Sequence, residues 1–267
     1  MKTQPFLFRI LLGCCLSGFI LPAMAQGEAS VIVSTAAEIY QEFKSAHPLV
    51  DSTQHIETET VQRVSNRLTK AVTDYYTQRK AGKELASFQW ETQLFQLKKV
   101  DAWCLPGGKI AVYDALIRVT QSDGSLAAVL AHEMAHVLLK HGDDRMKHIL
   151  KEFLGGKTLA ASLSAKPVET KDFYRMAYGN GDCVGVIRGF SAENEREADK
   201  LGAIFCGLAG YKPEEALVFW ERMIYLRGTG RQPELLSMHP VDDERLPALR
   251  RIMDEITQKY YTPSKKN

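Results

Sequence analysis

The chain has 267 residues, of which 45% are hydrophobic and 25% are charged. This length and composition predict one globular domain that buries its own core, and no solenoid-length repeat or low-complexity tract is present. The 34 basic and 32 acidic residues give a formal charge of +2 without a long block of one sign. A nucleic-acid-binding surface is therefore not indicated.

Residues 1–25 are predicted to be a signal peptide. They combine a basic start at Lys2 and Arg9, an apolar stretch over 6–21, and Ala23-Met24-Ala25 before a predicted cleavage site. An uncleaved membrane anchor is the competing interpretation, but glycine and serine residues interrupt the apolar stretch, which is short for a span. We expect cleavage after Ala25 and an exported, periplasmic protein.

A second alternative concerns the segment Leu11-Leu12-Gly13-Cys14, which loosely resembles a bacterial lipoprotein box. The apolar run before it is short, so a lipid anchor through Cys14 is the less favoured interpretation. Removal of the signal leaves Cys104, Cys183 and Cys206, an odd number in a compartment that permits disulfides. Cys183 could pair with either of the others, although Cys206 has the pattern of a small core residue.

Four segments are predicted between residues 26 and 113. Residues 26–55 lack sustained periodicity and suggest an N-terminal arm or a loose helix. Apolar residues recur at steps of three and four over 57–80, which predicts a helix. Residues 88–97 alternate like a strand, and 110–113 predict another strand beside it.

Helices are predicted for most of the remaining chain, with Gly142 and Gly210 as C-terminal stops and Pro213 in a first turn. Residues 155–190 suggest a long loop or lid with limited helix at its start. The main domain spans 56–262, and 263–267 form a tail. The predicted helices are 114–121, 124–140, 143–154, 191–208, 213–227 and 241–260.

The helix predicted for 124–140 carries His132-Glu133-Met134-Ala135-His136 in an apolar surrounding, so it is expected to be buried. At 3.6 residues per turn, His132 and His136 lie one above the other. Buried imidazoles need partners, and a zinc ion would supply one, with Glu133 placed to take a proton from zinc-bound water. The alternative is a pair of hydrogen-bonded core histidines beside a surface glutamate.

The third ligand is sought in the helix that opens at Ser191. Glu195 and Asp199 are four residues apart on one face, so Glu195 can point at the metal while Asp199 accepts the N–H of a ligand histidine. Glu193 and Glu197 point elsewhere and are expected to be solvated. The alternative is an ordinary acidic helix start.

These motifs resemble a known family, the HtpX/BepA/LoiP-like HExxH zinc metalloendopeptidases, to which the CAAX prenyl-protein protease also belongs. The shorter, soluble LoiP-like layout is closer to this chain than the membrane-embedded or BepA-like layouts. The resemblance rests on four segments in family order: 131–136, 194–199, 105–113 and Met238-His239-Pro240 followed by Arg245.

The resemblance implies a mostly helical α+β fold, minigluzincin-like, with a small sheet beside the active-site helix. It also implies zinc on His132, His136 and Glu195, with Glu133 as general base. The strand containing Gly108, Lys109, Ile110, Ala111 and Val112 would hold an extended substrate by strand addition. The alternative is an ordinary core strand.

His239 lies before Pro240 in a stiff loop. It could hydrogen-bond the oxyanion, fill the fourth zinc position and hold the enzyme idle, or simply pack. Arg245 belongs to the same segment, without an assigned role. His141 is interpreted as a helix-end residue and His148 as solvated, and neither is needed as a ligand.

The predicted function is hydrolysis of peptide bonds in unfolded or misfolded proteins, with envelope quality control as the setting suggested by the family. Outer-membrane or envelope assembly factors are candidate partners, and nucleic acid is not. One alternative is a catalytically silent, chaperone-like binder of misfolded envelope proteins. Another is a metal-dependent hydrolase of a non-peptide envelope component.

Overall fold

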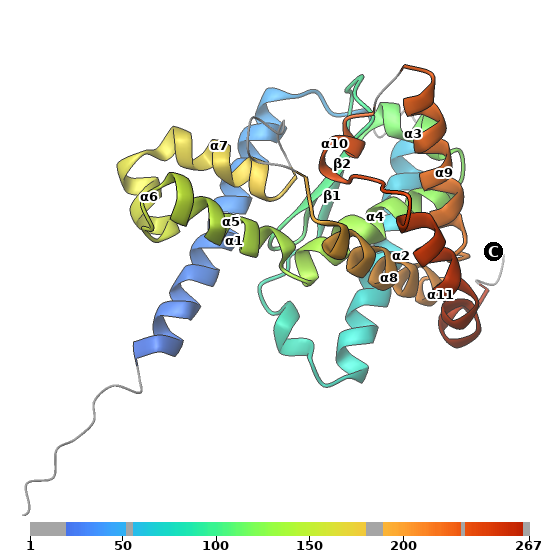
Figure 1. The fold of residues 1–267 in the computed structure, drawn as a ribbon, viewed down its shortest axis with the longest axis horizontal. Coiled ribbons are helices and arrows are strands. Elements are labelled where there is room, and N and C mark those ends of the chain that lie inside the picture. Colours follow the sequence, from blue (N-terminus) through green and yellow to red (C-terminus); the bar gives the residue numbers. More distant parts are fainter. Residues whose placement is uncertain (1–19, 52–55, 180–188, 231–232, 264–267) are drawn as a thin grey trace, which may run out of the picture.

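The computed structural model describes residues 20–51, 56–179, 189–230 and 233–263, with side chains from residue 27 onward (Figure 1). The fold is a mostly helical α+β domain with one small sheet, as predicted. The elements are α1 Ile20–Ala46, α2 Ile56–Gln78, η1 Gly82–Leu85, β1 Glu91–Phe95, β2 Ala102–Leu105, β3 Lys109–Tyr113, α3 Asp114–Thr120, α4 Asp123–Leu138, α5 His141–Phe153, α6 Leu159–Ala165, α7 Pro167–Ala177, α8 Ala192–Leu208, α9 Glu215–Gly228, α10 Leu235–Met238 and α11 Arg245–Tyr260.

The sheet has the order β1-β3-β2, with β1 parallel and β2 antiparallel to β3. The two predicted strands are therefore neighbours. The sequence did not indicate β2, because all four of its residues are buried and no alternation of polar and apolar side chains marks it. This strand packs directly against α4.

Helix α4 occupies the centre of the main core. Every residue from Ser125 to His136 is buried, and the helix packs against α2, α8, α9 and β2. Ser122 caps its start by accepting a hydrogen bond from the Ser125 amide. At Gly202 on α8, an added Cβ would lie 3.0 Å from the backbone nitrogen of His132, so a side chain there would force the two helices apart. Glycine at this position allows α8 to lie close beside the histidine-bearing helix.

A second apolar cluster lies on the other face of the sheet, where Figure 1 shows α1 beside α6 and α7. Ala36, Ile39 and Tyr40 of α1 are buried there. The region predicted as an arm or loose helix is thus largely one regular helix, which is stabilised by this packing rather than by a strong local pattern. The predicted loop over 155–190 likewise contains two helices, α6 and α7.

The break between α4 and α5 differs from the prediction. Gly142 does not terminate a helix; it is the second residue of α5, and Lys140 makes the turn with a left-handed φ of 62°. A Cβ on Gly142 would lie 2.2 Å from the ring of Tyr178, so close packing explains this glycine. Gly210 does have positive φ after α8, as expected of a stop.

Most of the predicted signal peptide lies outside the described residues, and α1 begins at Ile20, within its last six positions. Among the helices that the structure describes, none combines the length and the apolar character needed to cross a membrane.

Candidate metal centre

Four buried side chains converge at the centre of the main core. His132 and His136 come from α4, Glu195 from α8, and His239 from the loop after α10. One ligand atom from each lies within 4.8 Å of the others. His132 Nε2 is 3.0 Å from His136 Nε2 and 3.1 Å from His239 Nδ1, and His239 Nδ1 is 3.1 Å from Glu195 Oε1.

These separations fit a metal ion. With ligands about 2.0–2.2 Å from zinc, the edges of a tetrahedral site are about 3.3–3.6 Å long. The distances from His132 Nε2 to Glu195 Oε2 and from His136 Nε2 to Glu195 Oε1 are 3.3 and 3.4 Å. Three imidazole nitrogens and a carboxylate pointing at one another contain more acceptors than protons. A cation bound among them would give all four acceptor atoms a partner.

Glu133 lies beside this cluster. Its side chain is buried, and its Oε1 is 3.3 Å from His239 Nε2. Burial raises the pKa of the Glu133 carboxyl group to about 8, although the nearby His239 opposes the shift. A carboxyl group whose pKa lies near neutrality is suited to take up and release a proton.

Asp199 contacts the His132 ring on the side opposite the cluster. Its Oδ1 lies 2.9 Å from His132 Nδ1, the nitrogen that points away from the cluster. Arg245, buried on α11, contacts both oxygens of the same carboxylate, with Nε–Oδ2 at 2.7 Å and Nη2–Oδ1 at 2.8 Å. Burial alone would raise the pKa of Asp199, but Arg245 outweighs it and lowers that pKa to about 2. The carboxylate that faces His132 is therefore ionised.

Arg245 also contacts Glu195, with Nη1 2.5 Å from Oε2. Burial raises the pKa of Glu195, but the charge of Arg245 more than compensates and holds that pKa well below its usual value. One guanidinium group thus serves two buried carboxylates. The sequence indicated Arg245 but gave no reason for it, and this double pairing supplies the reason.

The loop carrying His239 is fixed on two sides. Arg245 Nη1 donates to the carbonyl oxygen of Pro240 at 3.2 Å, and the amide of Phe190 donates to the carbonyl oxygen of Met238 at 2.8 Å. The Phe190 ring lies over His136, with 4.0 Å between ring centroids. In this state the metal centre is covered, and His239 itself is only 1% exposed.

Sequence reasoning missed three contacts around the ligands. Trp220 on α9 donates from Nε1 to Asp199 Oδ1 at 3.2 Å, and no motif distinguishes it from an ordinary core aromatic residue. His141 is the first residue of α5, so it does lie at a helix end, but it is buried and its Nδ1 lies 3.0 Å from His136 Nδ1. Its Nε2 lies 3.2 Å from Glu197 Oε2, although the Glu197 side chain is 55% exposed.

Other predicted positions behave as follows. Ser191 opens α8 in a capping box with Asn194, while Glu193 and His148 are exposed. Cys104 and Cys206 are buried free thiols, so neither forms a disulfide in the part of the chain that the structure describes, and Cys183 lies outside that part.

The structure contradicts the predicted role of residues 108–112 as a substrate-binding strand. β3 has β1 on one side and β2 on the other along residues 109–112, and Gly108 uses its own N–H and C=O in hydrogen bonds to Leu105 and Glu91. Because both edges are occupied, Gly108, Lys109, Ile110, Ala111 and Val112 cannot accept a substrate by strand addition. They form an ordinary central strand, which was the alternative interpretation.

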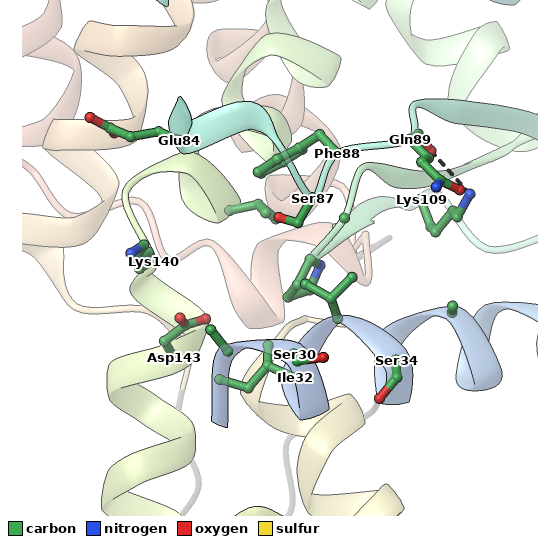
Figure 2. Close-up of a pocket in the computed structure, with 16 residues that line it drawn as sticks. Ser30, Ile32, Ser34, Glu84, Ser87, Phe88, Gln89, Lys109, Lys140 and Asp143 are labelled. Atoms are coloured by element: carbon green, nitrogen blue, oxygen red, sulfur yellow. Dashed lines mark hydrogen bonds between the residues drawn. The ribbon is translucent and has the colours of Figure 1, made fainter. Parts of the chain in front are cut away.

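A cavity of about 520 Å³ lies between α1, the segment 84–89, the turn at Pro106 and Gly107, and the junction of α4 with α5 (Figure 2). The Lys109 ammonium group points at the carbonyl oxygen of Gln89, 3.0 Å away. None of the residues lining this cavity belongs to the histidine and glutamate cluster. The chemistry therefore belongs to the buried cluster rather than to this cavity.

The fold and the site together define a mostly helical domain built around a buried metal centre on an HExxH helix. The model of Peptidase family M48 matches residues 57–253, and the chain belongs to this family. The match includes all four converging residues and Arg245.

Curated relatives agree with this assignment. The chain is 28% identical over 163 residues to the Mitochondrial metalloendopeptidase OMA1 of Schizosaccharomyces pombe, covering 61% of this chain and 46% of the relative. It is 29% identical over 158 residues to the Beta-barrel assembly-enhancing protease of Escherichia coli K12, covering 55% and 31%. The human Metalloendopeptidase OMA1, mitochondrial, is 26% identical over 177 residues, covering 64% and 34%. The chain thus spans less than half the length of these relatives.

Replacing Arg245 tests the buried charge arrangement. We expect Arg245→Met to lower the free energy of unfolding by about 3–5 kcal/mol, because two buried carboxylates lose their shared counter-charge. Combining Arg245→Met with Asp199→Asn should cost less than the sum of the single changes. Urea denaturation of the chelator-treated protein measures these differences.

Arg250→Met on the same helix is the matched control. Arg250 pairs with Glu221 at the surface, where both side chains are at least half exposed, so less than about 1 kcal/mol should be lost. Equal losses for the two methionine variants would contradict the importance of the Arg245 pairing.

Proposed function

We propose that this protein is a zinc-dependent endopeptidase. The observation that carries the proposal is the placement of a buried carboxyl group, Glu133, beside four converging ligand atoms on the helix that supplies two of them. A site used only to stabilise the fold would not require a base next to it. Membership of Peptidase family M48 and the printed names of the relatives support the same function.

In this proposal His132, His136 and Glu195 hold the zinc ion. Two neutral imidazoles and one carboxylate are a donor set that zinc prefers, and they leave a fourth position available. Burial lowers the pKa of His136 well below its usual value, which keeps this ring neutral and able to bind a cation. Asp199 fixes the orientation of the His132 ring by accepting its Nδ1 proton.

When bound, zinc would polarise the peptide carbonyl group and lower the pKa of a water molecule. Glu133 accepts the proton of the attacking water and later delivers it to the amine that leaves. The raised pKa of Glu133 favours both transfers at neutral pH. The surrounding burial excludes other water from the reacting groups.

His239 is proposed to keep the enzyme latent by taking the fourth zinc position. Its Nδ1 lies 3.1 Å from both His132 Nε2 and Glu195 Oε1, within the cluster itself. This placement favours a ligand over the oxyanion-binding role, which would require substrate to lie where the ring now is. Phe190 adds to the cover through its contact with His136.

The proposed substrates are unfolded or misfolded proteins of the cell envelope. One relative is named a Beta-barrel assembly-enhancing protease, which supports envelope or outer-membrane assembly factors as the setting. A catalytically silent, chaperone-like binder is the second candidate function. The cover formed by His239 and Phe190 favours it, because a peptide bond cannot reach a covered centre to be cut.

Glu133→Gln distinguishes an enzyme from a binder. We expect this change to abolish cleavage of unfolded casein, a loss of at least about 10³-fold, since the amide cannot take up the proton. Zinc content should be unchanged, because Glu133 is not among the proposed ligands. The wild-type protein treated with a zinc chelator and then reloaded provides the control. Casein cleavage that survives in the glutamine variant would refute the mechanism.

Removing the His239 ring tests latency. If the closed state is favoured about ten to one, His239→Ala should raise casein cleavage by about tenfold and weaken zinc binding at the same time. His148→Ala, an exposed histidine on α5, serves as the control and should change neither quantity. A fall in activity of about 10²–10³-fold would instead assign His239 to the oxyanion.

The location of the protein and the first residue of its mature form test the predicted export. We expect the full-length chain expressed in a Gram-negative bacterium to reach the periplasm and to begin at Gln26, as measured by intact mass and N-terminal sequencing. Bulky replacements at Ala23 and Ala25 should leave the signal uncleaved. A lipid-modified species beginning at Cys14, or a cytosolic chain that retains residue 1, would contradict this prediction.

A further inference from the structure

The two histidines of the HExxH helix are supported differently. The Nδ1 atom of His132 faces the buried carboxylate of Asp199 at 2.9 Å. The Nδ1 atom of His136 instead faces another imidazole, with 3.0 Å to His141 Nδ1. His141 is not one of the four converging side chains, yet it is also buried.

The backbone between the two histidines brings them together. In a continuous helix, residues five apart are about 140° apart around the axis, so His141 would point away from His136. Instead α4 ends at Leu138, and Lys140 adopts a left-handed conformation that few non-glycine residues take. Gly142 then packs against the Tyr178 ring with no room for a Cβ. This local strain and close packing return the His141 ring to His136.

The positions of the ring protons decide which histidine donates and which accepts in this contact. If His136 binds a metal through Nε2, its Nδ1 keeps a proton and must donate it. His141 Nδ1 therefore accepts, and the His141 proton lies on Nε2, which is 3.2 Å from Glu197 Oε2. The three groups form a chain in which each proton points toward the carboxylate.

We propose that His141 is a positioning residue that fixes His136 for metal binding, with Glu197 orienting His141 in turn. This inference rests on the proposed zinc site and goes beyond it by assigning roles to two side chains outside the ligand set. His141 does for His136 what Asp199 does for His132. Because the Glu197 side chain is half exposed, solvent screens its interaction with His141. Its contribution to zinc binding should therefore be smaller than that of His141.

The test measures zinc affinity of the full chain by competition with a chelating dye. His141→Phe keeps the ring shape but cannot accept a proton, and we expect it to weaken zinc binding by about 10–100-fold. His141→Asn places an oxygen near the former Nδ1 and should recover most of the affinity. Glu197→Gln should weaken binding by less than about fivefold. Added to His141→Phe, it should have no further effect, because Glu197 acts through His141.

His148→Phe on the same helix is the matched control, because that ring is exposed and should leave zinc binding unchanged. Urea denaturation without metal separates loss of fold from loss of affinity, and Glu197→Gln, at the surface, gives an arm that does not endanger folding. Zinc binding by a folded His141→Phe variant as tight as wild type would overturn the inference. So would an equal effect of Glu197→Gln in the presence and absence of His141. Failure of the wild-type chain to bind zinc would instead refute the proposed function.

Discussion

The buried guanidinium group of Arg245 is the interaction on which the metal centre depends. Burying a carboxylate without a counter-charge costs several kcal/mol or converts it to the neutral acid. Glu195 and Asp199 are both buried and both remain ionised because Arg245 contacts each of them. No ion pair joins Arg245 to Glu133 among the described residues. Burial raises the pKa of Glu133, although the charges of His239 and Arg245 oppose the shift. The contacts of one cation thus distinguish two ionised carboxylates from a third carboxyl group, Glu133, whose pKa lies near neutrality.

These charge contacts require α4, α8 and α11 to pack closely in one fixed arrangement. Gly202 lets α8 approach the backbone of His132, which places Asp199 within hydrogen-bonding distance of that ring. Trp220 of α9 then encloses the pair, since its indole donates to Asp199 while its ring lies 3.9 Å from the Arg245 guanidinium carbon. Close helix packing and charge pairing therefore support the same geometry.

Helical spacing explains which parts of the site could be predicted from sequence. His132 with His136, and Glu195 with Asp199, are pairs four residues apart, so each pair shares a face whatever the rest of the chain does. The role of Arg245 depends on how α11 packs on α8, and no local pattern encodes that packing. The contact of His141 with His136 was not predicted, because it results from a left-handed residue, Lys140, which the sequence does not mark as a glycine would. The family resemblance implied that the strand at 109–113 offers an edge. The sequence did not reveal that β2 covers this edge, because β2 is wholly buried and gives no alternating signal.

Arg245 also connects the ligand set to the loop that covers it, and the distances show which connection is the stronger. Its contacts with Glu195 and Asp199 range from 2.5 to 2.8 Å and join charged groups on two long helices. Its contacts with the carbonyl oxygens of His239 and Pro240 are 3.5 and 3.2 Å and involve neutral acceptors. Charge-assisted hydrogen bonds are roughly twice as strong as neutral ones. In the latent enzyme proposed above, withdrawal of His239 would therefore leave Arg245 in contact with both carboxylates.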